Sequence, residues 1–132
     1  MKRTLHVGLL AGVLALCLAK AATPIVGTWE GMQGAAKSAT IVVRETEGKI
    51  GGSAIFYIVH DEGSGAHNGE ETPPLEMIEP RWDGKLLRFS VVTSDGRSIA
   101  FEMRLTGEGT AELRRPEQDG TPELTVAMKR TR

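Results

Sequence analysis

Residues 86–105 read LLRFSVVTSDGRSIAFEMRL, and this stretch decides the fold. In its first half, apolar and polar side chains alternate from Leu87 to Val91. The second half repeats the alternation from Ile99 to Leu105, and Asp95-Gly96 separates the two halves. Alternation with a period of two is typical of an antiparallel strand with one solvated face, and Asp-Gly favours a tight hairpin turn. The stretch therefore predicts a β-hairpin.

The same pattern continues on both sides of this hairpin and predicts an all-β fold. Eight strand-like runs follow one another, and their connections include Glu47-Gly48, Asp83-Gly84, Asp95-Gly96 and Asp119-Gly120. Sequential hairpins make neighbouring strands pair, and eight strands are enough to close a sheet and remove its edges. We therefore expect an eight-stranded antiparallel up-and-down barrel, with a two-sheet sandwich as the alternative.

Two of the eight runs depart from simple alternation. The run from Lys49 to Val59 is apolar on both faces, so its pattern does not define an inward side. The run from Leu75 to Trp82 contains Pro80, which has no N–H to donate to a sheet. We expect a bulge or only partial pairing in that second run.

In a meander, successive connections alternate between the two ends of the barrel. Three short turns, at Glu47-Gly48, Asp83-Gly84 and 106–109, then lie at one end. The connections 31–37, 60–73, 95–96 and 117–120 lie at the other end, and three of these are longer. This arrangement predicts a cup with a tight base and a mouth of longer loops.

The first 21 residues have the features of a secretion signal. Lys2 and Arg3 precede an apolar stretch from Leu5 to Leu18, and Ala19-Lys20-Ala21 offers small residues for cleavage. An uncleaved anchor is the alternative, although the stretch is short for a membrane span. Cys17 suggests lipidation only weakly, because Leu16 precedes it. We expect residues 1–21 to be a signal peptide cleaved near Ala21, and the protein to be secreted or periplasmic.

Residues 22–132 then form one barrel domain without cysteine, and no membrane is expected as a partner once the signal is cleaved. Removal of Lys2, Arg3 and Lys20 takes the formal net charge from −1 to −4. No basic block or platform of aromatic and arginine residues is present, which argues against nucleic acid as a partner.

The segment Gly27-Thr28-Trp29-Glu30-Gly31 resembles the opening of lipocalin and avidin-type barrels, the calycin group. Gly51-Gly52-Ser53 also resembles the glycine-rich second hairpin of avidin-type chains, and the whole resembles small exported bacterial barrel domains. In lipocalins the matching tryptophan closes the base beside a basic residue of the last strand. The resemblance implies that Trp29 packs beside Arg130 or Arg132. The second lipocalin motif and the biotin ligands of avidins have no match here, so the resemblance implies a shape and not a ligand.

An eight-stranded barrel has an interior that side chains fill or that holds one small ligand. A packed core is one interpretation of its inward apolar residues, and a pocket for a small apolar molecule is the other. The residues expected to line such a pocket are Trp29, Phe89, Phe101, Met103, Leu113 and Met128.

The polar stretch 60–72 is expected to be a loop and carries the weak metal-site candidates His60, Asp61, His67 and Glu70. Carboxylates suit calcium, and two histidines with a carboxylate suit zinc. The spacing matches no established metal motif, and solvated acidic loops are common, so no metal and no cofactor are expected.

The sequence contains no pattern typical of a catalytic site, so an enzyme is not expected. The acidic residues of the mouth loops outnumber Lys37 and Arg97, which predicts a negative potential there and favours a cationic ligand over an anionic one. The alternative to a binding protein is a filled barrel whose outer face contacts another protein. Outward Leu86 and Val92 favour such a contact or a homo-oligomer.

Overall fold

The computed structural model describes residues 23–61 and 66–132. Within these ranges the regular secondary structure consists of β-strands, and no helix is present. The predicted all-β class is therefore confirmed, and the described residues include no helix suited to crossing a membrane. The expected signal, residues 1–21, lies outside them. The strands are β1 (Gly27–Gln33), β2 (Ala36–Thr46), β3 (Lys49–Asp61), β4 (Ala66–Glu71), β5 (Leu75–Glu76), β6 (Ile78–Trp82), β7 (Leu86–Val92), β8 (Ser98–Gly107), β9 (Thr110–Arg115) and β10 (Leu124–Arg130).

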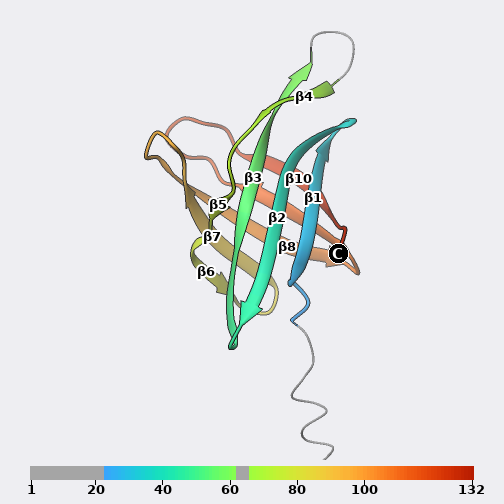
Figure 1. Ribbon diagram of the computed structural model, residues 1–132, viewed down its shortest axis with the longest axis vertical. Helices are drawn as coiled ribbons and strands as arrows, with labels where there is room; N and C mark the ends of the chain where they lie inside the picture. Colours follow the sequence, from blue (N-terminus) through green and yellow to red (C-terminus); the bar gives the residue numbers. More distant parts are fainter. Residues whose placement is uncertain (1–22, 62–65) are drawn as a thin grey trace, which may run out of the picture.

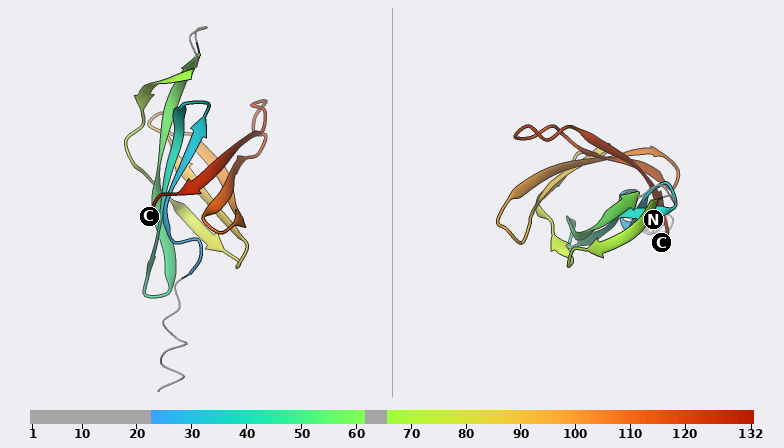
Figure 2. Two further views of the ribbon diagram at one scale, coloured as in Figure 1. Left: turned by 90° about the vertical axis from the view of Figure 1, so that its right-hand side faces the viewer. Right: turned by 90° about the horizontal axis from the view of Figure 1, so that it is seen from above.

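All pairings between these strands are antiparallel, and they form one strongly curled sheet. Its order is β4-β3-β2-β1-β10-β9-β8-β7-β6, with β5 paired to β3 (Figure 1). The first and last long strands, β1 and β10, are neighbours, with Trp29 opposite Arg130. Seen from above, the curl brings the wall of β1–β3 to face the wall of β7–β10 (Figure 2).

The described residues form ten strands, whereas the sequence predicted eight. One addition comes from the run Leu75–Trp82, which is divided into β5 and β6. β5 pairs with β3 and β6 pairs with β7, and the register of the second pairing shifts between Ile78 and Arg81. The irregularity expected at Pro80 is confirmed, and this run connects the two walls.

The second addition is β4, in a stretch expected to be a loop. There the backbone of His60 is paired with that of His67, and that of Asp61 with that of Ala66. The loop prediction was wrong because a polar, glycine-containing segment can still form a ladder through its backbone groups. Together, β3 and β4 extend the hairpin beyond the rest of the sheet (Figure 1).

The connections alternate between the two ends of the sheet as predicted, but two of the three longer mouth loops are shorter than expected. We call the end with the β2–β3, β6–β7 and β8–β9 turns the base, and the opposite end the mouth. At the base, Asp83 N donates to Leu86 O at 3.2 Å, which closes the Asp83-Gly84 turn. At the mouth, β1 and β2 extend so far that only residues 34–35 connect them, so the longer loop expected at 31–37 is absent.

Inward side chains fill the space between the walls in the lower half of the sheet. On β7 and β8 the buried residues follow the predicted alternation, with Leu87, Phe89 and Val91 facing Phe101 and Met103. The largest fully buried side chains are Ile25, Trp29, Ile41, Val43, Leu87, Val91 and Met103. β3 directs Ala54 and Phe56 inward, because they are opposite the buried residues Ile41 and Ala39.

Candidate functional site

A cavity of about 340 Å³ lies at the mouth end of the curled sheet. Its walls come from the mouth ends of β1, β2, β3, β7, β8, β9 and β10 and from the segment between β4 and β5. The residues that line it are Gln33, Ser38, Ala39, Phe56, Tyr57, Thr72, Leu75, Val91, Thr93, Ile99, Phe101, Leu113, Arg115, Leu124 and Val126.

Along β2 the interior changes from a packed core to the wall of the cavity. Near the base, Trp29 is paired with Ile41, and both are fully buried. The next inward pair toward the mouth is Gly31 and Ala39. Ala39 lines the cavity, whereas the inward side of Gly31 is covered by Met128 and Val126, which an added Cβ would approach to 2.6 and 2.7 Å. On β2 the packed core thus gives way to the cavity between Ile41 and Ala39.

Phe56 and Phe101 form the inner end of the cavity, and Phe89 lies beneath Phe101 in the packed core. Phe56 of β3 stacks on Phe101 of β8, with ring centroids 4.9 Å apart, and Phe101 also stacks on Phe89 at 5.6 Å. The first stack joins the two walls across the interior. Offset stacking at these distances adds about 0.5–1.5 kcal/mol to the effect of burial. The rings thus separate the packed base from the cavity.

The six residues predicted to line a pocket fall into two groups. Phe101 and Leu113 line the cavity. Trp29, Phe89, Met103 and Met128 lie below it in the packed core, with exposures of 0–3%. All six are buried inside the curled sheet, but alternation does not indicate the height along the strands at which packing ends.

Sequence reasoning missed most of the cavity wall, including Phe56, Ser38 and Arg115. Phe56 lies in the run that is apolar on both faces. Arg115 continues the alternation of Ala111 and Leu113 on β9, so the sequence pattern could have predicted that its side chain points inward. Ser38 is placed by a bulge, since the register shifts between Gly31 and Met32 and leaves Ser38 without a cross-strand partner.

At the base, Trp29 packs beside a basic residue, as the resemblance to lipocalins implied. The Arg130 guanidinium carbon lies 4.7 Å from the Trp29 ring centroid, so Arg130, and not Arg132, covers the ring. The indole N–H donates to the Ile25 carbonyl at 3.0 Å, and Arg130 donates to the Pro24 carbonyl. This cluster joins β1, β10 and the segment that precedes β1.

Two polar atoms of the cavity residues are buried without a hydrogen-bond partner among the described residues. They are the Ser38 hydroxyl oxygen and the Arg115 Nε. The Arg115 Nη2 donates to the Pro122 carbonyl at 3.1 Å, and Arg115 forms no ion pair with another described residue. Buried polar groups are normally paired, so these donors have capacity for another acceptor.

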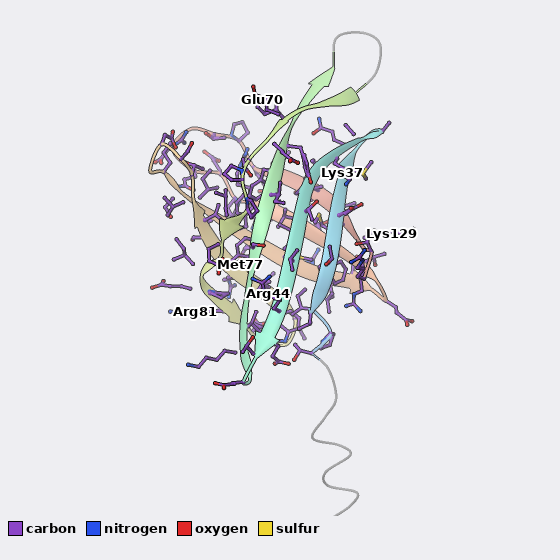
Figure 3. All side chains as sticks on the ribbon, viewed as in Figure 1. Lys37, Arg44, Glu70, Met77, Arg81 and Lys129 are labelled. Atoms are coloured by element: carbon purple, nitrogen blue, oxygen red, sulfur yellow. The ribbon has the colours of Figure 1, made fainter. Side chains whose placement is uncertain are left out.

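The acidic residues near the mouth lie in solvent. Glu70, labelled on β4 in Figure 3, is exposed, as are Glu71, Glu117 and Asp119. The Thr93 hydroxyl donates to Asp95 and lowers the pKa of that carboxyl below its ordinary value. None of the described residues that line the cavity carries a carboxylate.

The weak metal-site candidates of the stretch 60–72 cannot be placed together, because most of their side chains lie outside the described part of the structure. The side chains of His60, Asp61 and His67 lie outside the described part of the structure, and Glu70 is exposed on β4. Elsewhere among the described residues, no group of three acidic, histidine or cysteine side chains is placed to hold a metal ion.

Comparison with known proteins leaves the chain without a family assignment. No protein-family model matches it, and no curated protein matches it.

Proposed function

We propose that the protein is an exported, non-enzymatic binding protein with a calycin-like barrel that holds a small apolar molecule in the mouth cavity. The observation that carries the proposal is the cavity of about 340 Å³, lined mainly by Phe56, Ile99, Phe101, Leu113 and Val126. Pockets for small molecules are apolar hollows of roughly 300–1,000 Å³ with a few polar groups. The cavity has both the size and this composition.

The lining favours an apolar ligand over a cationic one. A cation in a low-dielectric site requires a carboxylate or an aromatic cage, and the described lining residues include no carboxylate. The packing of Arg130 on Trp29 supports the calycin-like interpretation of the curled sheet. The features of residues 1–21 support export.

A filled barrel that contacts another protein is the second candidate function. Its support is the set of apolar residues exposed toward the mouth, which includes Met32, Val92 and Leu124 at 43–45%. A patch of this kind is typical of a contact surface when its residues are contiguous. The two candidates differ in one measurable property, because only the first binds small molecules in the interior.

A fluorescence titration with the neutral probe N-phenyl-1-naphthylamine tests the proposal on protein produced from the full-length gene. Ile99 lines the cavity, and its neighbour Ala100 is exposed on the other face of β8. We expect Ile99→Trp to weaken probe binding by about tenfold or more, or about 1.4 kcal/mol, because the indole occupies the cavity. Ala100→Trp introduces the same indole outside the cavity and should leave the affinity unchanged.

The absence of probe binding, or equal affinities for both tryptophan variants, would contradict the proposed site. The intact mass of the same purified protein tests export, since we expect the loss of residues 1–21. Native mass spectrometry of that sample would also reveal a ligand that co-purifies.

A further inference from the structure

The arginines of β7–β9 point in two directions and have different partners. Arg88, Arg104 and Arg114 lie on the outer face, and each contacts a glutamate carboxylate at 2.6–3.4 Å. Arg115 lies on the inner face of β9, one residue after Arg114, and lines the cavity. Its Nε is buried without an acceptor, and its Nη2 donates to a backbone carbonyl of Pro122.

Arg115 is only partly buried, but its Nε is shielded from solvent without an acceptor, and a shielded donor of a charged group is costly to leave unpaired. The other described residues that line the cavity include no acidic group that neutralises Arg115. The guanidinium therefore has unused donor capacity and an uncompensated positive charge beside the cavity. Both properties suit an anionic group, and a guanidinium holds carboxylate or sulfonate oxygens with directed N–H donors.

Ser38 supplies a second unused donor in the cavity wall. A Cβ added at Gly31 would lie 3.3 Å from Ser38 Oγ and 2.7 Å from a methyl carbon of Val126, so the three residues are neighbours. Arg115 lies on the other side of β10, since β9 ends at Arg115 opposite Leu124, the first residue of β10. The two donors therefore lie on either side of β10, whose residues Leu124 and Val126 also line the cavity.

The rest of the cavity suits the apolar body of a ligand. Phe56 and Phe101 form its inner end, 4.9 Å apart, and Ile99 and Val126 belong to its sides. The rings are thus deep in the cavity, and Arg115 lies toward its mouth, opposite the first residue of β10. The exposed carboxylates of the mouth loops lie in water, where salt screens their repulsion of an anion.

We propose that the cavity binds an amphipathic anion, with an aromatic or aliphatic body against Phe56 and Phe101 and a carboxylate or sulfonate group held by Arg115, while Ser38 offers a second donor in the cavity wall. This inference rests on the proposed function and specifies the class of ligand. It reverses the preference for cations that the composition of the mouth loops predicted.

Two probes that differ by a single anionic group test the inference. They are N-phenyl-1-naphthylamine, which is neutral, and 1-anilinonaphthalene-8-sulfonate, which carries the same rings and a sulfonate. We expect the wild-type protein to bind the sulfonate probe about tenfold more tightly, since a hydrogen bond to a charged group contributes enough for that difference. Arg115→Gln should abolish this preference while the affinity for the neutral probe stays the same.

Two further variants separate the site from general effects of charge. Arg104→Gln removes the same charge from the outer face, where Arg104 contacts Glu112 at 3.4 Å, and should preserve the preference. Ser38→Ala should reduce the preference by about twofold to threefold, because a neutral hydroxyl contributes less than a guanidinium. A melting curve for each variant confirms that it is folded.

The outcomes distinguish the two proposals. If the neutral probe binds and the sulfonate gives no advantage, or if Arg115→Gln leaves the advantage intact, the anion site is excluded and the proposed function stands. If neither probe binds to the folded protein, both proposals fail.

Discussion

The base and the mouth of this protein use the same strands for different purposes. At the base, Trp29 and Ile41 form an inward cross-strand pair with no exposed surface, and Arg130 covers the indole ring. One inward pair higher, Ala39 lines the cavity, and Phe56, opposite Ala39 on β3, forms part of its inner end. The difference teaches that the packed core and the cavity are separated along the strands of the curled sheet. Changes at the base should affect folding, and changes at the mouth should affect binding.

The largest expected effect is the loss of the tryptophan at the base. Trp29→Ala should reduce the free energy of unfolding by about 3–5 kcal/mol, because it removes a fully buried ring and leaves a cavity. Leu124→Ala at the mouth should cost less than about 1.5 kcal/mol, since that side chain is 44% exposed. Urea denaturation of both variants measures the difference, and similar losses would contradict the division into two regions.

A smaller effect is expected at Gly52, near the base of β3. Its φ is +156°, and a Cβ there would lie 1.9 Å from the Val42 carbonyl oxygen of the paired strand. Gly52→Ala should therefore destabilise the fold by about 2–3 kcal/mol, as the backbone must shift out of register.

The adjacent Gly51 provides the matched control for this prediction. A Cβ at Gly51 meets no atom within 4 Å. Gly51→Ala should be neutral or should stabilise the fold by up to about 1 kcal/mol, because alanine restricts the unfolded chain. Equal melting temperatures for the two alanine variants would show that the close contact between β2 and β3 is absent in solution.

The covering of Trp29 by Arg130 should contribute a further, smaller amount to the stability of the base. Arg130→Met should cost about 1–2 kcal/mol through the loss of the cation–π contact and of the hydrogen bond to Pro24. Arg132→Met removes the same charge from an exposed side chain and should have almost no effect. Chemical denaturation of the two variants tests the assignment, and an equal loss for both would contradict it.

The smallest effects concern two exposed carboxylates with different partners. At the base, the backbone N–H groups of Leu86 and Lys85 donate to Asp83 and lower its pKa. Near the mouth, the Arg114 guanidinium lowers the pKa of Glu123, with N–O distances of 2.9 and 3.1 Å. Because both pKa values are lower in the folded state, each carboxylate favours folding above its unfolded pKa, and this contribution is lost as the pH falls through the folded pKa.

High salt should distinguish these two carboxylates. It screens the attraction between Glu123 and Arg114, whereas the amide hydrogen bonds of Asp83 involve no second full charge. In an NMR titration at 1 M sodium chloride, we expect the pKa of Glu123 to rise toward its ordinary value and that of Asp83 to stay low. A salt-independent pKa for Glu123 would indicate that the guanidinium contact is absent.

Prediction from the sequence succeeded where one face of a strand is polar and the other is apolar. The inward positions of β7, β8 and β10 were read from alternation, and the Asp83 and Asp95 turns follow from turn chemistry. The contact between Trp29 and a basic residue was predicted from the resemblance of residues 27–31 to lipocalins. Prediction was wrong for the stretch that contains β4, because its strand depends on backbone pairing and not on side-chain pattern.

The sequence by itself determined the all-β class, the order of the hairpins and the inward side of the amphipathic strands, since these depend on neighbours in the chain. The tertiary structure alone decided which side of β3 is inward, how β5 and β6 connect the walls, and where packing ends above Trp29. It also brought Ser38 and Arg115 to one cavity. The physical reason is that alternation fixes a face for each residue, whereas the space at that face depends on side chains from strands distant in sequence.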